Sequence, residues 1–190
     1  DEGKPLARSE AMLGGRATGV PGALSLLEMA HADHGDLPWS AAFEGAIALA
    51  REGYPLTGRT HKYIHGSHPQ SGAPDVQAIF RMPNGELARE GDRFVNAAYA
   101  DTLEKIARGG TTAFYDSDEI AGEIVGKTHR DPLPGTITRD DLRDYRALRT
   151  TPVCRPYRTY VVCVPPPPSS GVAVLQILGI LEGTDIARRG

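Results

Sequence analysis

Two serines with potentially nucleophilic hydroxyls directly follow a run of four prolines. Ser169, Ser170 and Gly171 follow Pro165–Pro168, which follow the apolar run Val161–Val164. A hydroxyl becomes a nucleophile when a base lies within hydrogen-bond reach, and no His/Asp pattern here predicts such a partner. A serine that precedes a helix is more often its N-cap, because the side-chain oxygen accepts from a free backbone N–H. We expect a cap at this point and retain the three residues only as a candidate substrate-binding site.

Three histidines form a second candidate. His61, His65 and His68 are spaced by four and three residues, which would bring three imidazoles to one helical face, as a zinc site needs. Several glycines and prolines interrupt the stretch, and no thiol or acidic ligand lies among the histidines. The sequence therefore favours a solvated, irregular loop over about residues 57–75, and we predict no metal site.

Adjacent carboxylates at Asp140 and Asp141 suggest general acid–base chemistry. Neighbouring residues of a helix point apart, however, and both carboxylates would lie near the positive end of a short helix that begins after Thr138. We therefore interpret Thr138 as an N-cap and the two aspartates as residues of the first turn, and we assign no catalytic residue to this chain.

The elements that would position these groups are mainly helical. Apolar spacing predicts helices over residues 23–34, 40–52 and 94–108, each stopped by glycine. Ser117 or Asp118 caps a further helix. Within the 94–108 helix, the better apolar face uses Val95, Tyr99, Leu103 and Ile106–Ala107.

Short strands complete the prediction. Residues 78–82 lead into an Asn-Gly turn, and residues 111–115 are β-prone. Residues 153–164 form a plausible hairpin, which must stop at Pro165 because proline lacks the ladder N–H. Residues 165–168 then form an extended, polyproline-like rod, and a mostly apolar, buried helix follows over about residues 172–182.

Composition limits the class of protein. The chain has 40% hydrophobic and 24% charged residues and a net charge of −3, which indicates a soluble globular chain without general affinity for nucleic acid. No apolar run spans a bilayer. The only cysteines, Cys154 and Cys163, make no disulfide framework. We expect two free, half-buried thiols; a single bridge is the alternative if they face each other on a hairpin.

Several motifs resemble one family throughout the chain. The segments are GxxAxGVPG near Gly15–Gly22, GDLPW with AIALAREGYPL, the helix and AFY block near residues 91–115, and PPPPSSGV from Pro165. In order and spacing, they resemble the large subunit of the γ-glutamyltranspeptidase family of N-terminal-nucleophile hydrolases. Pro165 adds one proline to the family pattern, and Val172 replaces its second glycine.

The resemblance implies an α+β, mainly helical fragment of an αββα sandwich, one partial domain over residues 1–190 without an internal boundary. It implies an autoprocessed enzyme whose small subunit carries an N-terminal threonine that attacks a γ-glutamyl amide such as glutathione. The nucleophile and its amine base belong to one chain-initiating residue, which Asp1 cannot supply. No Thr-Thr-His junction is present, and the glutamate-binding arginine of the family lies upstream. We therefore expect an internal segment, inactive alone, that supports the substrate pocket and subunit interface.

Further expectations follow from the same resemblance. No cofactor is implied, and the location is periplasmic or extracellular. Packing against a sheet supplied by other segments should leave apolar surface exposed around Ile177 and Leu178. Two alternatives stay open: an acylase-like relative that acts on another amide, and a non-catalytic interaction module that folds alone.

Overall fold

The computed structural model describes residue 3 and residues 5–186 of the chain. Expectations about Asp1 therefore lie outside the described residues. Contacts divide the chain into two compact units, residues 1–147 and residues 148–190, called here the N-terminal and C-terminal units. The single partial domain expected from the sequence stays a prediction, because two contact units can belong to one domain of a larger protein.

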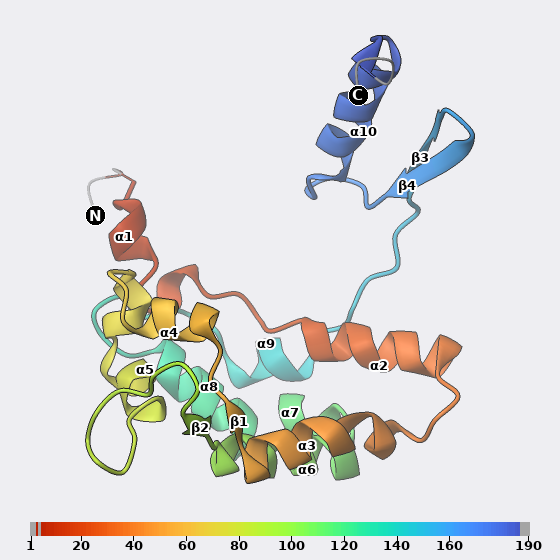
Figure 1. Cartoon of the computed structure of the whole chain (residues 1–190). Coiled ribbons are helices and arrows are strands. Elements are labelled where there is room, and N and C mark those ends of the chain that lie inside the picture. Colours follow the sequence, from red (N-terminus) through yellow and green to blue (C-terminus); the bar gives the residue numbers. More distant parts are fainter. Residues whose placement is uncertain (1–2, 4, 187–190) are drawn as a thin grey trace. The chain divides into compact units, whose positions relative to one another are not determined.

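The N-terminal unit is built almost entirely of helices, joined by short loops (Figure 1). Its only strands in the described residues are two-residue segments, β1 and β2, paired antiparallel. The elements in order are α1 (Arg8–Ala11), η1 (Gly15–Ala17), α2 (Ala23–His34), η2 (Trp39–Phe43), α3 (Glu44–Glu52), β1 (Tyr54–Pro55), α4 (Gly58–Ile64), η3 (Pro69–Gly72), α5 (Pro74–Ile79), β2 (Arg93–Phe94), α6 (Ala97–Gly109), α7 (Thr112–Tyr115), α8 (Ile120–Thr128) and α9 (Arg139–Arg143).

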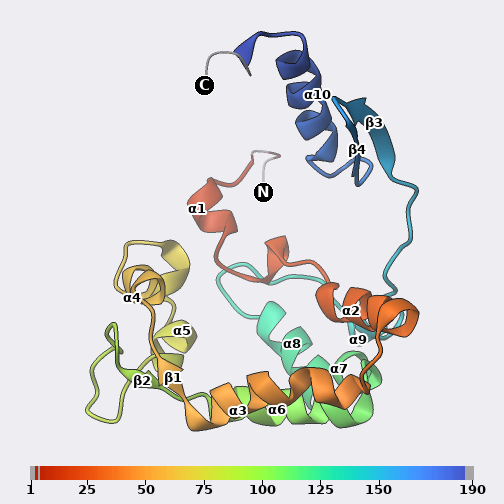
Figure 2. The same ribbon diagram turned by 45° about the vertical axis from the view of Figure 1, so that its right-hand side comes forward.

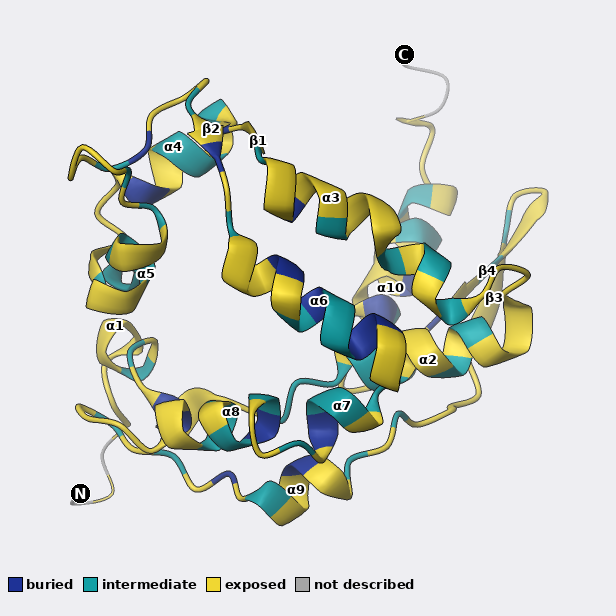
Figure 3. Cartoon of the chain, turned by 90° about the horizontal axis from the view of Figure 1, so that it is seen from below, coloured by how far each residue is buried: buried dark blue, intermediate teal, exposed yellow. Residues whose placement is uncertain are grey.

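Helix α6 lies along α3 and carries a row of buried residues (Figure 3). Ala100, Leu103, Ile106 and Ala107 form that row. Asn96 begins the helix, since its side chain accepts from the N–H of Tyr99. The predicted helix is confirmed, but the predicted face is partly wrong: Val95 and Tyr99 are 47% and 53% exposed. The buried stripe runs through Ala100 instead of Tyr99.

A second core joins the C-terminal helices of this unit. Tyr115, Ala121, Ile137 and Leu142 form a buried cluster contributed by α7, α8, α9 and the loop before α9. The β-prone stretch 111–115 is therefore helical, and the strand prediction is wrong. Tertiary packing overrides the β propensity of this stretch, because its aromatic residues are buried against neighbouring helices.

The predicted capping of α9 is confirmed. Thr138 and Asp141 form a reciprocal capping box, in which each side chain accepts from the other residue's N–H. The N-cap position of α8 is Glu119, not Ser117 or Asp118 as predicted, although the hydroxyl of Ser117 accepts from the N–H of Ile120, the first residue of the helix.

The irregular loop predicted over residues 57–75 is wrong. The stretch contains α4, η3 and the start of α5, and each begins at a residue suited to that place. Thr57 accepts from the N–H of Thr60, and prolines occupy the first helical positions of η3 and α5. The glycines and prolines thus mark the ends of short helices. Ile64 anchors α4 in a small core.

The Asn-Gly turn that follows is confirmed, but the strand before it is not. Gly85 donates to Met82 O and has a φ of 84°, the left-handed region that glycine tolerates. Helix α5 extends into the predicted strand as far as Ile79, and of the strand only an isolated bridge from Arg81 to Leu87 remains.

The C-terminal unit consists of a hairpin and a helix, which lie side by side in Figure 2. Strands β3 (Val153–Tyr157) and β4 (Tyr160–Val164) pair antiparallel, as the sequence predicts, and α10 (Gly171–Glu182) packs on one face of them. The chain is thus mainly helical with few strands, in keeping with the predicted class.

Two predictions for this unit are wrong. Cys154 and Cys163 are directly opposite in the hairpin register and form a disulfide, and both residues are exposed. The expected half-buried free thiols are therefore excluded in this structure. Helix α10 is also not a buried helix: Gly171 and Leu175 are its only buried residues. Ile177 is 57% exposed, as expected from a missing packing partner.

Candidate functional site

The proline segment forms a turn between β4 and α10, not the predicted extended rod. The N–H of Ser169 donates to Pro166 O at 3.3 Å, which closes a four-residue turn. The turn reverses the chain so that α10 packs back on the strand it has just left. Only a residue without a side chain fits at the first helical position, because a Cβ on Gly171 would lie 2.6 Å from Val164 Cβ.

Ser169 and Ser170 are exposed, and the predicted side-chain cap is wrong. Ser170 occupies the N-cap position with φ −71° and ψ 0°, and its side chain makes no capping hydrogen bond. N-cap residues that bond through the side chain normally have an extended backbone, which aims the oxygen at the helix N–H groups. Ser170 has helical angles instead, in keeping with the absence of a capping bond. Among the described residues, no hydrogen bond joins either hydroxyl to a basic side chain.

The structure separates the three histidines. The rings of His61 and His65 lie 4.4 Å apart on α4, while His68 stacks on Tyr63. His65 Nε2 is 3.1 Å from Ala88 O. In residues 3 and 5–186, no three His, Cys, Asp or Glu side chains are grouped so that they could hold a metal ion.

Sequence reasoning missed a polar pocket of about 300 Å³ in the N-terminal unit. Tyr115 lines this pocket, and its hydroxyl donates to Pro21 O at 2.6 Å and accepts from the N–H of Ser25 at 3.2 Å. Burial raises the pKa of this phenol above its ordinary value. The lining residues are Ser25, Glu28, Thr111, Thr112, Tyr115, Asp116, Arg143, Tyr145 and Arg146.

Charged groups of this pocket are engaged within the protein. Glu28 accepts from the N–H and the hydroxyl of Thr111 at 3.2 and 2.6 Å. Arg143 pairs with Asp140 and Asp144, and these carboxylates raise the pKa of its guanidinium. Arg146 donates to two backbone carbonyls. The arrangement joins α2, α7 and the end of α9, and no sequence signal marks it because the bonds from Glu28 to Thr111 and from Ser25 to Tyr115 link residues 83 and 90 positions apart.

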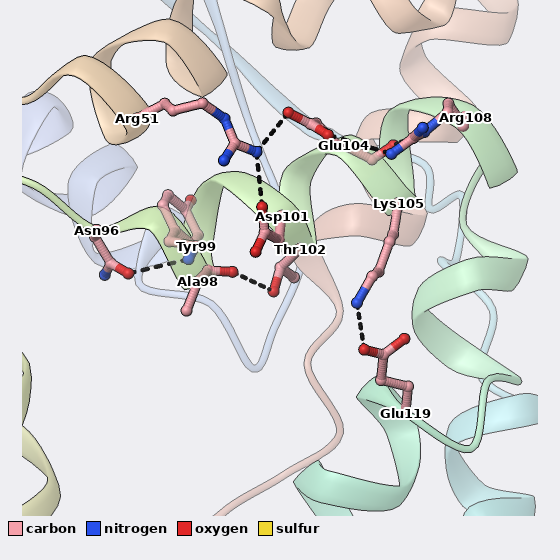
Figure 4. Close-up of polar contacts among 10 residues, drawn as sticks. All are labelled: Arg51, Asn96, Ala98, Tyr99, Asp101, Thr102, Glu104, Lys105, Arg108 and Glu119. Atoms are coloured by element: carbon pink, nitrogen blue, oxygen red, sulfur yellow. Dashed lines mark hydrogen bonds and ion pairs between the residues drawn. The ribbon is translucent and has the colours of Figure 1, made fainter.

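An exposed ion-pair network covers the outer side of α6 (Figure 4). Arg51 of α3 bridges Asp101 and Glu104 at 2.7 and 2.6 Å, and hydrogen bonds to these carboxylates raise its pKa. Arg108 joins Glu104, and Lys105 joins Glu119. Exposed pairs of this kind contribute little stability individually. The network links α3 to α6 through Arg51 and offers no catalytic pair.

Comparison with known proteins decides the family. A model of the family described as gamma-glutamyltranspeptidase matches residues 1–190. This chain belongs to the γ-glutamyltranspeptidase family. It is 33% identical over 193 residues to the glutathione hydrolase proenzyme of Escherichia coli (strain K12), covering 100% of this chain and 32% of the relative. It is 34% identical over 185 residues to the acylase ACY 1 proenzyme of Pseudomonas sp. (strain V22), covering 95% and 32%.

Solved structures agree with this assignment. The γ-glutamyltranspeptidase of Helicobacter pylori matches with a TM-score of 0.84 and 28% identity, over 97% of this chain and 53% of that chain. The curated relatives are longer proteins, and this chain spans 27% to 32% of their length. No helix in residues 3 and 5–186 has the length and apolar character needed to cross a membrane.

Proposed function

We propose that this chain is a segment of the large subunit of an enzyme that transfers or hydrolyses γ-glutamyl amides, glutathione among them. The match of the family model over residues 1–190 carries the proposal. The catalytic threonine is the first residue of a small subunit and lies outside this chain. The word proenzyme in the names of two relatives supports a processed precursor. Residues 1–190 alone are then inactive.

The exposed face of α10 supports a packing partner in the whole enzyme. Gly171, Leu175 and Gly179 recur every four residues and face the hairpin. The opposite stripe is apolar as well: Val174, Ile177 and Ile180 are 45%, 57% and 70% exposed. A helix that is apolar on all sides requires cover on both faces.

The partner that covers α10 is, in this proposal, the rest of an αββα sandwich. The hairpin adds Tyr160 and Val161, exposed by 70% and 68%. These surfaces supply the interface with the remaining large-subunit segments and the small subunit.

Ser169, Ser170 and Gly171 are proposed to border the substrate pocket of the assembled enzyme. Their support is the exposure of both serines at the start of a helix, where the first backbone N–H groups have no partner within the helix. Replacing each serine by alanine in the whole enzyme should raise KM for a γ-glutamyl anilide while kcat is preserved. An unchanged KM in both variants would remove them from the pocket.

An exported location is part of the same proposal. The Cys154–Cys163 disulfide supports it, because disulfides persist in oxidising compartments such as the periplasm and the extracellular space. Fractionation of cells that express the full-length protein, followed by immunodetection, tests this location. Recovery with the cytosolic fraction would contradict it.

Two samples test the activity. The full-length protein should release the chromophore from a γ-glutamyl anilide, and denaturing mass spectrometry should find a second chain that begins with threonine. Residues 1–190 alone should release none. Robust turnover by residues 1–190 would contradict the proposal that the catalytic threonine lies outside this chain. An unprocessed, inactive full-length protein would contradict the proposed mechanism.

A second function is favoured by one relative. The acylase ACY 1 proenzyme is about as similar to this chain as the glutathione hydrolase is. The full-length protein would then cleave another amide, with the same processing and the same nucleophile. Comparing kcat/KM for a γ-glutamyl anilide with that for an acyl amide lacking the γ-glutamyl amine and carboxylate separates the two.

A further inference from the structure

The disulfide shares one face of the hairpin with an apolar side chain. Side chains alternate between the two faces of a strand, and α10 packs on the face that carries Val164 and Arg155. Cys154 and Cys163 pair on the opposite face, together with Val161, which is 68% exposed. The proposed function places the rest of the enzyme on this apolar surface, so the same cover encloses both sulfur atoms. An oxidant therefore reaches the two cysteines only before the rest of the enzyme packs.

The C-terminal unit has little core of its own at that stage. Among its described residues, 148–186, only Val164, Gly171 and Leu175 are buried. An isolated two-stranded hairpin is marginally stable in water, and a unit of this size usually needs a disulfide or a packing partner to stay folded. The cross-link is therefore the main support of the hairpin until the partner packs.

The cross-link also fixes the register on which α10 rests. Gly171, at the start of the helix, lies against Val164, and Gly179 lies against the guanidinium of Arg155. Each of these two strand residues directly follows one of the cysteines. A slip of one residue in the hairpin would turn such residues to the other face. Because the disulfide excludes this slip, it holds the hairpin in the arrangement that α10 requires.

From the shared face, the small core and the register, we propose that closure of the Cys154–Cys163 disulfide is a maturation step that precedes assembly and cutting of the precursor. The inference rests on the proposed function, in which the rest of the enzyme covers α10 and the precursor cuts itself. A chain cuts itself only when folding holds the reacting groups in place. The hairpin thus acts as a redox switch that keeps the precursor uncut until it reaches an oxidising compartment.

The oxidant is a small-molecule or protein disulfide of that compartment. The thiolate of one cysteine attacks a sulfur of this donor, which forms a mixed disulfide and expels the donor's other sulfur as a thiolate. The thiolate of the second cysteine then attacks the sulfur of the first. The Sγ–Sγ bond forms, and the rest of the donor leaves as a second thiolate. Two electrons pass from the cysteines to the donor, which also takes up the two protons that the cysteines release.

The test follows the full-length precursor during cell-free synthesis, with either 2-hydroxyethyl disulfide as the donor or dithiothreitol as the reductant. A denaturing gel measures the cut fraction over time. Alkylation after denaturation marks open cysteines, and the tryptic peptides 150–158 and 159–188 assign the label to this pair. We expect the disulfide to be closed in the uncut precursor. Dithiothreitol should slow cutting about 10- to 100-fold, the upper figure being the full contribution of a cross-link between residues nine positions apart.

The variant with both cysteines replaced by serine is the matched control. It should be cut slowly with either reagent and should not respond to dithiothreitol, which separates this hairpin from any other cysteine of the full-length protein. A further measurement needs no variant. Dithiothreitol added after cutting should leave the disulfide closed in the absence of denaturant, because the assembled enzyme covers it.

Four results would overturn the proposal. The unaltered precursor could be cut at one rate with the cysteines open or closed, or the disulfide could form only after cutting. Dithiothreitol could slow the serine variant as much as the unaltered protein, or it could rapidly open the disulfide of the cut, native enzyme. Each of these results leaves the proposed function intact, because cutting is still observed. An unaltered precursor that is never cut in the presence of the donor contradicts the proposed function and this inference with it.

Discussion

The hydroxyl of Tyr115 should contribute more to the stability of the N-terminal unit than any exposed hydrophobic contact. The residue is 6% exposed, and its hydroxyl bonds to Pro21 and Ser25, which are 94 and 90 positions away in sequence. Tyr115→Phe keeps the ring in the core but leaves Pro21 O and the N–H of Ser25 without their partner. An unpaired buried polar group costs about 1–3 kcal/mol, so the loss of both bonds should cost about 2–3 kcal/mol.

Fluorescence of the single tryptophan provides the assay. Trp39 belongs to the same unit and donates from Nε1 to Ile106 O at 3.1 Å, so its emission reports unfolding of this unit. Urea unfolding should show the lower midpoint in Tyr115→Phe with an unchanged slope. Tyr99→Phe, which removes a hydroxyl from a residue 53% exposed, should stay within about 0.5 kcal/mol of the unchanged chain.

Alkaline pH gives an independent check. Burial raises the pKa of Tyr115 above 10.0, so the folded state holds this proton more tightly than the unfolded state does. Its contribution is complete below pH 10.0 and is lost as the pH rises through the folded pKa. Tyr115→Phe should lack this part of the alkaline loss. A change below about 0.5 kcal/mol in urea, with unaltered alkaline behaviour, would refute the reasoning.

Three further predictions concern backbone fit, capping and the cross-link. Gly15→Ala should destabilise the N-terminal unit by about 2–3 kcal/mol in the same urea unfolding, because the added Cβ would overlap a carbonyl of α8. Gly19→Ala is the control and should be nearly neutral, because its added Cβ meets no atom within 4 Å. Thr138→Ala should cost about 1 kcal/mol by the same measurement, and equal stability in both chains would contradict the capping role. Hydrogen bonds from Thr138 lower the pKa of Asp141 below 3.8, so this stabilisation is present above pH 3.8 and is lost as the pH falls through the folded pKa; hydrogen exchange of α9 should follow that loss. The disulfide joins cysteines nine positions apart in sequence, and reducing it should destabilise the hairpin by about 2.5–3 kcal/mol. Amide hydrogen exchange in β3 and β4 should then be about 100-fold faster. Unchanged exchange would show that the two strands stay paired without the disulfide.

Features encoded by neighbouring residues could be predicted from the sequence. The helices near α2, α3 and α6, the capping box at Thr138 and the Asn-Gly turn each depend on a few consecutive residues. The hairpin over residues 153–164 follows from its β-branched residues and the prolines after it. The family could also be read from ordered motifs, since they extend along nearly the whole chain.

The candidate site was predicted less well, because its geometry depends on packing. Ser170 occupies the N-cap position, yet Gly171 packs against Val164, and the turn before it leaves Ser170 with helical angles and no capping hydrogen bond. The polar pocket around Tyr115 had no sequence signal at all, because its groups come from segments that only folding brings together.

The sequence by itself determined the family, the mainly helical class and the positions of α2, α3, α6 and α9, because those depend on local spacing, caps and motif order. Only the tertiary structure decided that Cys154 and Cys163 meet, since a disulfide requires facing register across two strands. It also decided that residues 57–75 form short helices and that α10 buries only one of its two apolar faces. The apolar residues of a helix predict that its surface will be buried, but which segment buries that surface depends on the three-dimensional arrangement of the chain.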